Sequence, residues 1–219
     1  MIAGIMRAMQ TIGSLGKRPR EGRDYAIDLL RGTSDVAIMA PHGGGIEPGT
    51  DSIAKAIAGQ NHSYYAFKGI RPRGNRRLHR TSHRFDEPQA TALLKSVQTV
   101  VTLHGCREKT AVLFVGGLDT ALGERIAATL SRHPFDAHTV TAGALRGIHP
   151  ENLCNRGRRR CGVQLEMSFG LRQQLLGDRF MAHPAASDLF RPFIFLVRQA
   201  LNNACRRPPA EPCENDPCC

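Results

Sequence analysis

Aromatic residues and long apolar runs are scarce in this sequence. It has no tryptophan and three tyrosines, and aromatic residues make up 5% of its 219 residues. Few aromatic rings leave few platforms for stacking unpaired bases. No apolar run approaches the roughly 18–20 residues of a membrane helix, so we expect no membrane partner. The mildly apolar N-terminus is interrupted by Arg7 and does not resemble a signal peptide. We therefore expect a cytoplasmic protein, with release on lysis as an alternative.

Paired cysteines with metal-binding spacing are also missing. The sequence has seven cysteines but no C-x-x-C pair, which argues against a zinc site built from thiolates. Without an export signal we expect these thiols to be reduced. Three of them lie in residues 207–219, a segment rich in Pro, Glu, Asn and Asp that we expect to be disordered.

Acidic residues are few relative to basic ones. The chain has 19 Asp and Glu against 30 Lys and Arg, a formal net charge of +11. This charge favours a polyanionic partner, either nucleic acid or an acidic polymer. No helix-turn-helix, zinc-finger or RNP-like pattern accompanies it, so nucleic acid is the less favoured partner. The arginine-rich segment 71–84 could bind carboxylates through bidentate contacts, or it could be a solvated loop.

Apolar runs with the length of strands alternate with helical patterns along the chain. The alternation predicts an α/β fold with an open, mixed and largely parallel sheet flanked by helices. We expect one catalytic domain over residues 25–206, preceded by a loosely ordered lead-in over residues 1–24. Strands are predicted over residues 35–40, 63–69, 99–105, 111–117 and 163–168, and helices over 49–59, 88–97, 119–133 and within 187–207.

Two of the predicted strands end close to a histidine followed by glycine. His42 follows strand 35–40, and His104 lies at the end of strand 99–105. Ligands bind beyond the carboxyl ends of strands in open α/β sheets, and Glu47 follows His42 on a glycine-rich loop. Two imidazoles and a carboxylate form a zinc set with one position open for water. The alternatives are structural turns at the histidines, or a phosphate-binding loop, although the Gly-Lys-Ser/Thr ending of a P-loop is missing.

A carboxylate in the last predicted strand is a candidate general base. Glu166 is the acidic side chain in the apolar stretch 163–168. A carboxylate in such a strand must face a cleft or find a partner. We expect Glu166 to take the proton of an attacking water and to pass it to a leaving amine.

Six long motifs follow one another along the chain: APHGGGIEPGT, LHRTSHRFDEP, TLHGC, VGGLD, NLCNRG and GVQLEMSFGLR. Together they resemble one known family, the poly-γ-glutamate hydrolases of bacteriophages and bacterial genomes. The resemblance extends over roughly residues 35–175 and implies a zinc-carboxypeptidase-like α/β fold that cleaves γ-glutamyl amide bonds in an acidic polymer. It also implies that His42, Glu47 and His104 ligate Zn²⁺ and that Glu166 is the general base and acid.

Substrate-binding residues are predicted from the same resemblance. Related zinc peptidases hold a substrate carboxylate with asparagine and arginine side chains near the metal. We accordingly expect His79, Asn155 and Arg156 to contact the substrate, poly-γ-glutamate or a similar acidic polymer. Two alternatives stay open: a basic nucleic-acid-binding protein connected with phage replication, and a zinc deacylase or amidase acting on a small acidic amide. The oligomeric state is left unassigned.

Overall fold

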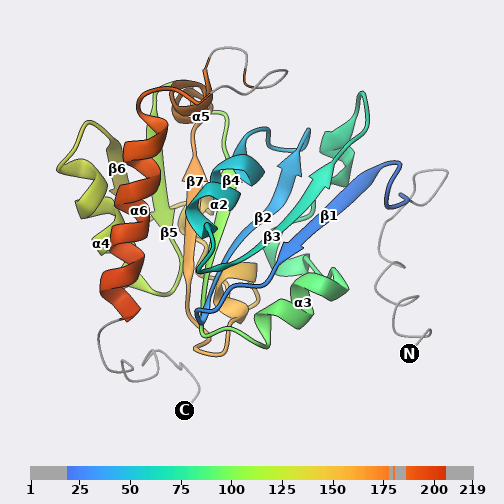
Figure 1. Cartoon of the computed structure of the whole chain (residues 1–219), viewed down its shortest axis with the longest axis horizontal. Helices are drawn as coiled ribbons and strands as arrows, with labels where there is room; N and C mark the ends of the chain where they lie inside the picture. Colours follow the sequence, from blue (N-terminus) through green and yellow to red (C-terminus); the bar gives the residue numbers. More distant parts are fainter. Residues whose placement is uncertain (1–18, 178–179, 181–185, 206–219) are drawn as a thin grey trace.

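The computed structural model describes residues 19–177, 180 and 186–205. Most of the expected lead-in and the whole expected tail over residues 207–219 lie outside these ranges. The described residues form one seven-stranded sheet with strand order β1-β3-β2-β4-β7-β5-β6 (Figure 1). The strands are β1 (Tyr25–Leu30), β2 (Val36–Gly44), β3 (Ser63–Gly69), β4 (Thr99–Gly105), β5 (Val112–Gly116), β6 (Asp136–Thr139) and β7 (Val163–Met167).

The centre of the sheet is parallel and both of its flanks contain an antiparallel pair. Strands β3, β2, β4 and β7 run parallel to one another, and β5 runs parallel to β6. The pairs β1/β3 and β5/β7 are antiparallel. The predicted α/β class, with an open, mixed and largely parallel sheet, is therefore confirmed.

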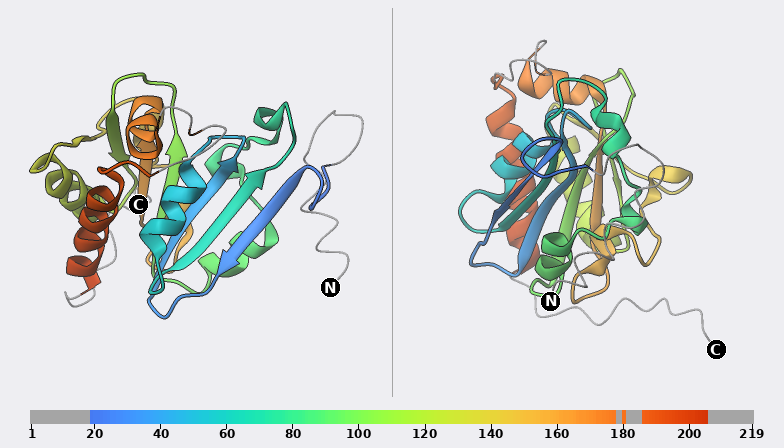
Figure 2. Two further views of the ribbon diagram at one scale, coloured as in Figure 1. Left: turned by 45° about the horizontal axis from the view of Figure 1, so that its top comes forward. Right: turned by 90° about the vertical axis from the view of Figure 1, so that its right-hand side faces the viewer.

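Helices cover both faces of the sheet. Helices α2 (Thr50–Ala58), α4 (Thr120–Ser131), α5 (Phe169–Leu176) and α6 (Phe190–Cys205) contribute to the larger apolar core. Helix α3 (Pro88–Leu94) packs into a second core on the opposite face. The edge-on view shows α2 and α6 together on one side of the sheet (Figure 2). Among the described helices, none has the length and apolar character needed to cross a membrane.

Side-chain caps fix where two of these helices begin. The Asp119 carboxylate accepts the backbone N–H of Leu122 at 3.1 Å, as expected for the N-cap of α4. Glu87 caps α3 by accepting from the backbone N–H groups of Gln89 and Ala90. Short 3₁₀ helices connect the other elements: η1 (Asn75–Leu78), η2 (Ser82–Arg84), η3 (Ala144–Arg146) and η4 (Leu153–Arg156).

An irregularity in β2 determines the direction of its last side chains. The register of β2 against β3 shifts between Ala40 and Gly43, so β2 contains one extra residue there. The β2/β4 pairing ends at Met39 and Thr102, three residues before His42 and two before His104. In a regular ladder this difference would turn the two histidines to opposite faces. The bulge restores a common face, so both imidazoles can meet at the carboxyl edge of the sheet.

Candidate metal centre and its pocket

His42, Glu47 and His104 converge at the carboxyl ends of β2 and β4. The two Nδ1 atoms of His42 and His104 lie 3.1 Å apart. Glu47 Oε1 lies 3.2 Å from His42 Nδ1, and Glu47 Oε2 lies 3.8 Å from His104 Nδ1. The sequence places these residues up to 62 positions apart, and the fold brings their ligand atoms into one small volume.

The loop from His42 to Glu47 is held closed by its backbone. The Glu47 N–H donates to the His42 carbonyl at 2.8 Å. Gly44 has a φ of 60°, and a Cβ on it would lie 2.5 Å from the Gly69 carbonyl oxygen. Glycine is therefore required at this turn, because a side chain would meet the neighbouring strand.

The hydrogen bonds of the two imidazoles leave their Nδ1 atoms facing each other. His42 Nε2 lies 2.6 Å from the Arg80 carbonyl oxygen, which can only accept, so in the neutral ring Nε2 carries the proton and Nδ1 keeps its lone pair. His104 Nε2 lies 3.3 Å from Ser82 Oγ. A backbone carbonyl that accepts from the outer ring nitrogen is the usual partner of a metal-ligating histidine.

The spacing of the donor atoms fits a tetrahedral ion. Ligands bound to zinc at roughly 2.0–2.1 Å lie about 3.3 Å from one another in tetrahedral geometry. The two nitrogens are 3.1 Å apart, and they lie 3.2 and 3.8 Å from the two different oxygens of the Glu47 carboxylate, so the separations are close to this value. Two imidazole nitrogens and one carboxylate oxygen are also the donor set of open, catalytic zinc sites.

Charge and burial favour an anionic Glu47 beside neutral His104. Burial works against a charged Glu47, but the close contacts with the His42 and His79 rings outweigh it and hold the pKa of that carboxyl well below its usual range. Glu47 Oε2 also accepts the Gly105 N–H at 2.9 Å. Burial lowers the pKa of His104 to about 3, and the neighbouring His42 adds to this effect. His104 is thus neutral at physiological pH, so one of its ring nitrogens keeps a lone pair.

His79 borders the same three residues. Its ring stacks on His42 with centroids 4.0 Å apart, and its Nε2 lies 3.4 Å from Glu47 Oε1. His42, Glu47 and His79 also satisfy the distance criteria for a group that could hold a metal ion. The His79 side chain is 43% exposed, whereas His42 is 2% exposed. We give more weight to the His42, Glu47 and His104 set, because the His104 side chain is 5% exposed and therefore far more buried than that of His79.

Glu166 lies on the strand next to His104. The two residues are Cα partners in the parallel β4/β7 pair, so their side chains project to the same face of the sheet. Glu166 is 8% exposed and accepts a hydrogen bond from Gln164 Nε2 at 3.0 Å. Burial, together with the negative charge of Glu47, raises the pKa of Glu166 to about 8, although Arg172 opposes the shift. Such a carboxyl group can both hold and release a proton near neutral pH.

Asn155 does not have the substrate-binding geometry that we predicted. Its side chain is fully buried and all four of its hydrogen-bonding positions are used. No donor or acceptor of the amide is left for a substrate, so the geometry assigns Asn155 a structural role. Oδ1 accepts from Leu118 N and Gly162 N, both at 3.2 Å, and Nδ2 donates to Gly147 O at 2.8 Å and His149 O at 3.0 Å.

Arg156 contacts the segment that covers the histidines. Its guanidinium donates to the Phe85 carbonyl at 2.5 Å, and the Phe85 ring lies edge-on to His42 with centroids 6.4 Å apart. Arg156 therefore holds the backbone of a residue whose ring packs against His42. A direct contact between Arg156 and substrate stays a prediction.

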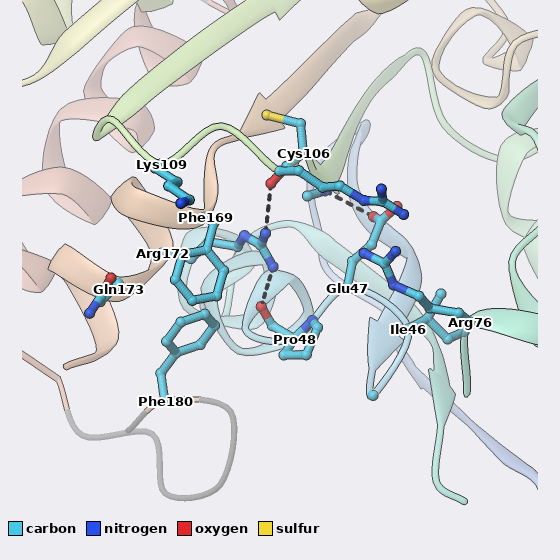
Figure 3. A pocket seen from close by; sticks show the side chains of 13 residues that line it. Ile46, Glu47, Pro48, Arg76, Cys106, Lys109, Phe169, Arg172, Gln173 and Phe180 are labelled. Atoms are coloured by element: carbon cyan, nitrogen blue, oxygen red, sulfur yellow. Dashed lines mark hydrogen bonds between the residues drawn. The ribbon is translucent and has the colours of Figure 1, made fainter. Parts of the chain in front are cut away.

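Arg172, on α5, was not among the predicted site residues. It is 4% exposed and its guanidinium connects the two loops that carry the ligands. NH1 donates to the Pro48 carbonyl at 2.8 Å and NH2 to the Cys106 carbonyl at 2.9 Å (Figure 3). Arg172 is the last residue of the motif GVQLEMSFGLR. The signal that could have identified it is a charged residue on a short helix that is otherwise largely buried.

A cavity of about 490 Å³ opens beside Glu47 and Gly105, within the range of small-molecule sites. Figure 3 shows the Phe169 and Phe180 rings next to the Arg172 guanidinium, with Lys109 and Arg76 on opposite sides of it. The arginines of segment 71–84 therefore do not all have the same role. Arg76 lines the cavity, whereas Arg71 pairs with Asp24 at 2.7 Å and Arg80 with Asp86 at 3.6 Å.

The comparison with known families agrees with the motifs. Residues 10–195 match the family described as poly-gamma-glutamate hydrolase. The chain belongs to the poly-γ-glutamate hydrolase family. Among curated relatives, UPF0714 protein YndL of Bacillus subtilis (strain 168) is 33% identical over 162 residues, which cover 74% of this chain and 64% of YndL. The SPbeta prophage-derived protein YoqZ of the same strain is 32% identical over 170 residues, 76% of this chain and 62% of YoqZ. The chain spans slightly under two thirds of the length of these relatives.

Solved structures of this family have the same fold. A structure described as bacteriophage poly-gamma-glutamate hydrolase superposes with a TM-score of 0.82 at 29% identity, covering 85% of this chain and 92% of that one. A structure described as zinc-free YndL has a TM-score of 0.79 at 31% identity, covering 83% of this chain and 91% of that one. An N-formylglutamate amidohydrolase from Ralstonia eutropha JMP134, 11% identical with a TM-score of 0.52, shares the fold alone.

Proposed function

We propose that this protein is a zinc-dependent hydrolase that cleaves the γ-glutamyl amide bonds of poly-γ-glutamate. The observation that carries the proposal is the convergence of His42, Glu47 and His104 beside a buried carboxyl group, Glu166, in a member of this family. The description of a related structure as zinc-free YndL supports zinc as the metal.

The three proposed ligands would hold Zn²⁺ with one coordination position left open. The ion would polarise the scissile carbonyl and make a water molecule easier to deprotonate. Glu166 takes the proton of that water, because its raised pKa matches proton transfer near neutral pH. It then delivers the proton to the departing α-amine of the next glutamyl unit. We infer that His79, whose side chain is 43% exposed beside Glu47, donates a hydrogen bond to the substrate.

An acidic polymer agrees with the charges around the site. Each γ-linked unit keeps its α-carboxylate free, so the substrate is a polyanion. The chain has a net charge of +11, and basic side chains line the cavity beside Glu47. Positive charge attracts and steers such a substrate toward the site.

The direct test is the release of new amines from poly-γ-glutamate, with α-linked polyglutamate of equal length as the control. We expect amines to appear with the γ-linked polymer and to stop on addition of a chelator. Restored cleavage after zinc is added back would identify the metal. Absence of cleavage by the zinc-loaded chain would contradict the proposed function.

A further inference from the structure

The cavity beside Glu47 is lined by positive charges that have no anionic partner among the residues that the structure describes. Arg76, Arg107 and Lys109 line it, and all three are exposed. Among the described residues, the ion pairs of lysines and arginines involve other cations: Arg23, Lys68, Arg71, Arg80, Arg159 and Arg160. Glu108, between Arg107 and Lys109 in the sequence, is not part of the lining, and its carboxylate accepts the Thr110 N–H at 2.9 Å.

The cations come from different sides of the cavity. Arg76 belongs to η1, whereas Arg107 and Lys109 belong to the loop between β4 and β5. Figure 3 shows Arg76 and Lys109 on opposite sides, with Glu47 and the Arg172 guanidinium between them. Arg172 is already bonded to backbone carbonyls, so the exposed cations are the ones available to a ligand. Their separation suits an anion with more than one charged group better than a single small ion.

Apolar surface is present as well. The rings of Phe169 and Phe180 form part of the lining, and they lie within 5.9 Å of the Arg172 guanidinium carbon. A ligand with methylene groups between its charged groups would contact these rings while its carboxylates reach the cations. The cavity is therefore suited to a flexible chain that alternates short alkyl segments with carboxylates.

We propose that this cavity is a substrate subsite that binds a γ-linked glutamyl segment with at least two free α-carboxylates, one facing Arg76 and one facing Lys109, with Arg107 as a third cation of the lining. The inference rests on the proposed function and extends it by naming the side chains that select an acidic polymer over a neutral one. Two charges on the ligand explain why the cations occupy two sides of the cavity.

The test compares two variants that remove the same amount of charge. Arg107→Gln with Lys109→Gln removes two cations from the cavity, and both side chains are exposed, so folding should be retained. Arg73→Gln with Arg77→Gln removes two exposed cations from the segment around Arg76 that do not line the cavity. Binding of tri-γ-glutamate is measured calorimetrically at physiological salt, using the full chain with Glu166→Gln so that the ligand is not consumed.

We expect the cavity pair to raise the Kd about tenfold or more, which corresponds to ~1.4 kcal/mol. The control pair should raise it by less than about threefold, because salt screens exposed charges that do not touch the ligand. A trimer with amidated α-carboxylates should bind at least about tenfold more weakly than tri-γ-glutamate.

Equal weakening in both pairs, or equal binding of the amidated trimer, would overturn the subsite. So would a chain that fails to bind tri-γ-glutamate. Cleavage by the chain with Glu166 intact is measured separately. If the variant with Arg107→Gln and Lys109→Gln keeps the wild-type KM for poly-γ-glutamate, the subsite is refuted and the hydrolase function stands. If binding of tri-γ-glutamate depends on the cavity cations but the chain cleaves no polymer, the subsite stands and the hydrolase function is refuted.

Discussion

Replacement of Arg172 by methionine should weaken both the fold and the metal site. The guanidinium donates to Pro48 O at 2.8 Å, to Cys106 O at 2.9 Å and, less favourably, to Ser168 O at 3.3 Å. A hydrogen bond to a charged group contributes roughly 1.5–3 kcal/mol, and methionine supplies no donor. Burying the guanidinium costs free energy that methionine does not incur. We therefore expect the free energy of unfolding to fall by about 2–3 kcal/mol rather than by the full sum.

The effect on the metal should exceed the effect on a distant site. Pro48 directly follows Glu47, and Cys106 lies two residues after His104, so release of these carbonyls loosens two proposed ligands together. Loss of such a supporting contact typically lowers metal affinity about 10–100-fold. Arg172→Lys should restore part of the stability but little of the affinity, because one ammonium group is a compact point charge without the planar fork of a guanidinium.

Urea unfolding in a chelator measures the first effect, and competition with a zinc-binding dye measures the second. Arg191→Met, at an exposed position of α6, is the matched control and should change neither quantity. Zinc affinity within about twofold of the wild type in Arg172→Met would refute the claim that this residue positions the ligand loops.

Three further predictions concern the base, its titration and the buried amide. Glu166→Gln should keep the bound zinc but lower kcat by roughly 10²–10⁴-fold, measured as amine release; a variant that kept full activity would not fit the assignment. In the metal-free chain, the pKa of Glu166 is raised from 4.5 to about 8, so its contribution to stability is complete below pH 4.5 and is lost as pH rises toward 8. Glu166→Gln should remove this decline, a relative gain on the order of 3 kcal/mol between pH 5 and pH 7 by chemical unfolding; parallel curves would contradict it. Asn155→Ala should lower the free energy of unfolding by about 2–4 kcal/mol, because its amide is hydrogen-bonded to backbone groups. The KM for poly-γ-glutamate should not change, because the amide does not reach the substrate. A raised KM in a folded variant would show that Asn155 contacts the substrate after all.

The central strands could be predicted from the sequence because they are buried on both faces of the sheet. The predicted strands 63–69 and 99–105 coincide with β3 and β4. The edge strands β1 and β6 were missed. β1 is half-buried along most of its length and therefore has no clear apolar alternation, and β6 has four residues, of which one is buried.

Part of the candidate site could also be predicted from the sequence, for a different reason. His42 and His104 both come at strand ends, and parallel strands bring their carboxyl ends to one edge. The prediction placed His42 on a loop after its strand, whereas β2 continues through it to Gly44. The bulge that turns His42 toward His104 leaves no trace in the apolar pattern, since it depends on pairing with β3.

Asn155 shows what a motif cannot give. An asparagine next to an arginine has the chemistry to bind a carboxylate, but the backbone groups that saturate its amide come from four separate positions of the folded chain. Arg172 is the opposite case, a site residue that its motif did not indicate. Its hydrogen bonds to the loops of the proposed ligands join residues up to 124 positions apart, so its role depends on the packing of α5 beside both loops.

The most direct test of the account is the metal content of the purified chain, measured by elemental analysis for the wild type and for His42→Ala, with the viscosity of a poly-γ-glutamate solution followed in parallel. The account predicts about one zinc per chain in the wild type, loss of that zinc in the variant, and a fall in viscosity that requires the metal. A wild-type chain that binds no zinc after loading, or that lowers the viscosity equally well without it, would contradict the zinc-dependent hydrolase assigned to His42, Glu47 and His104.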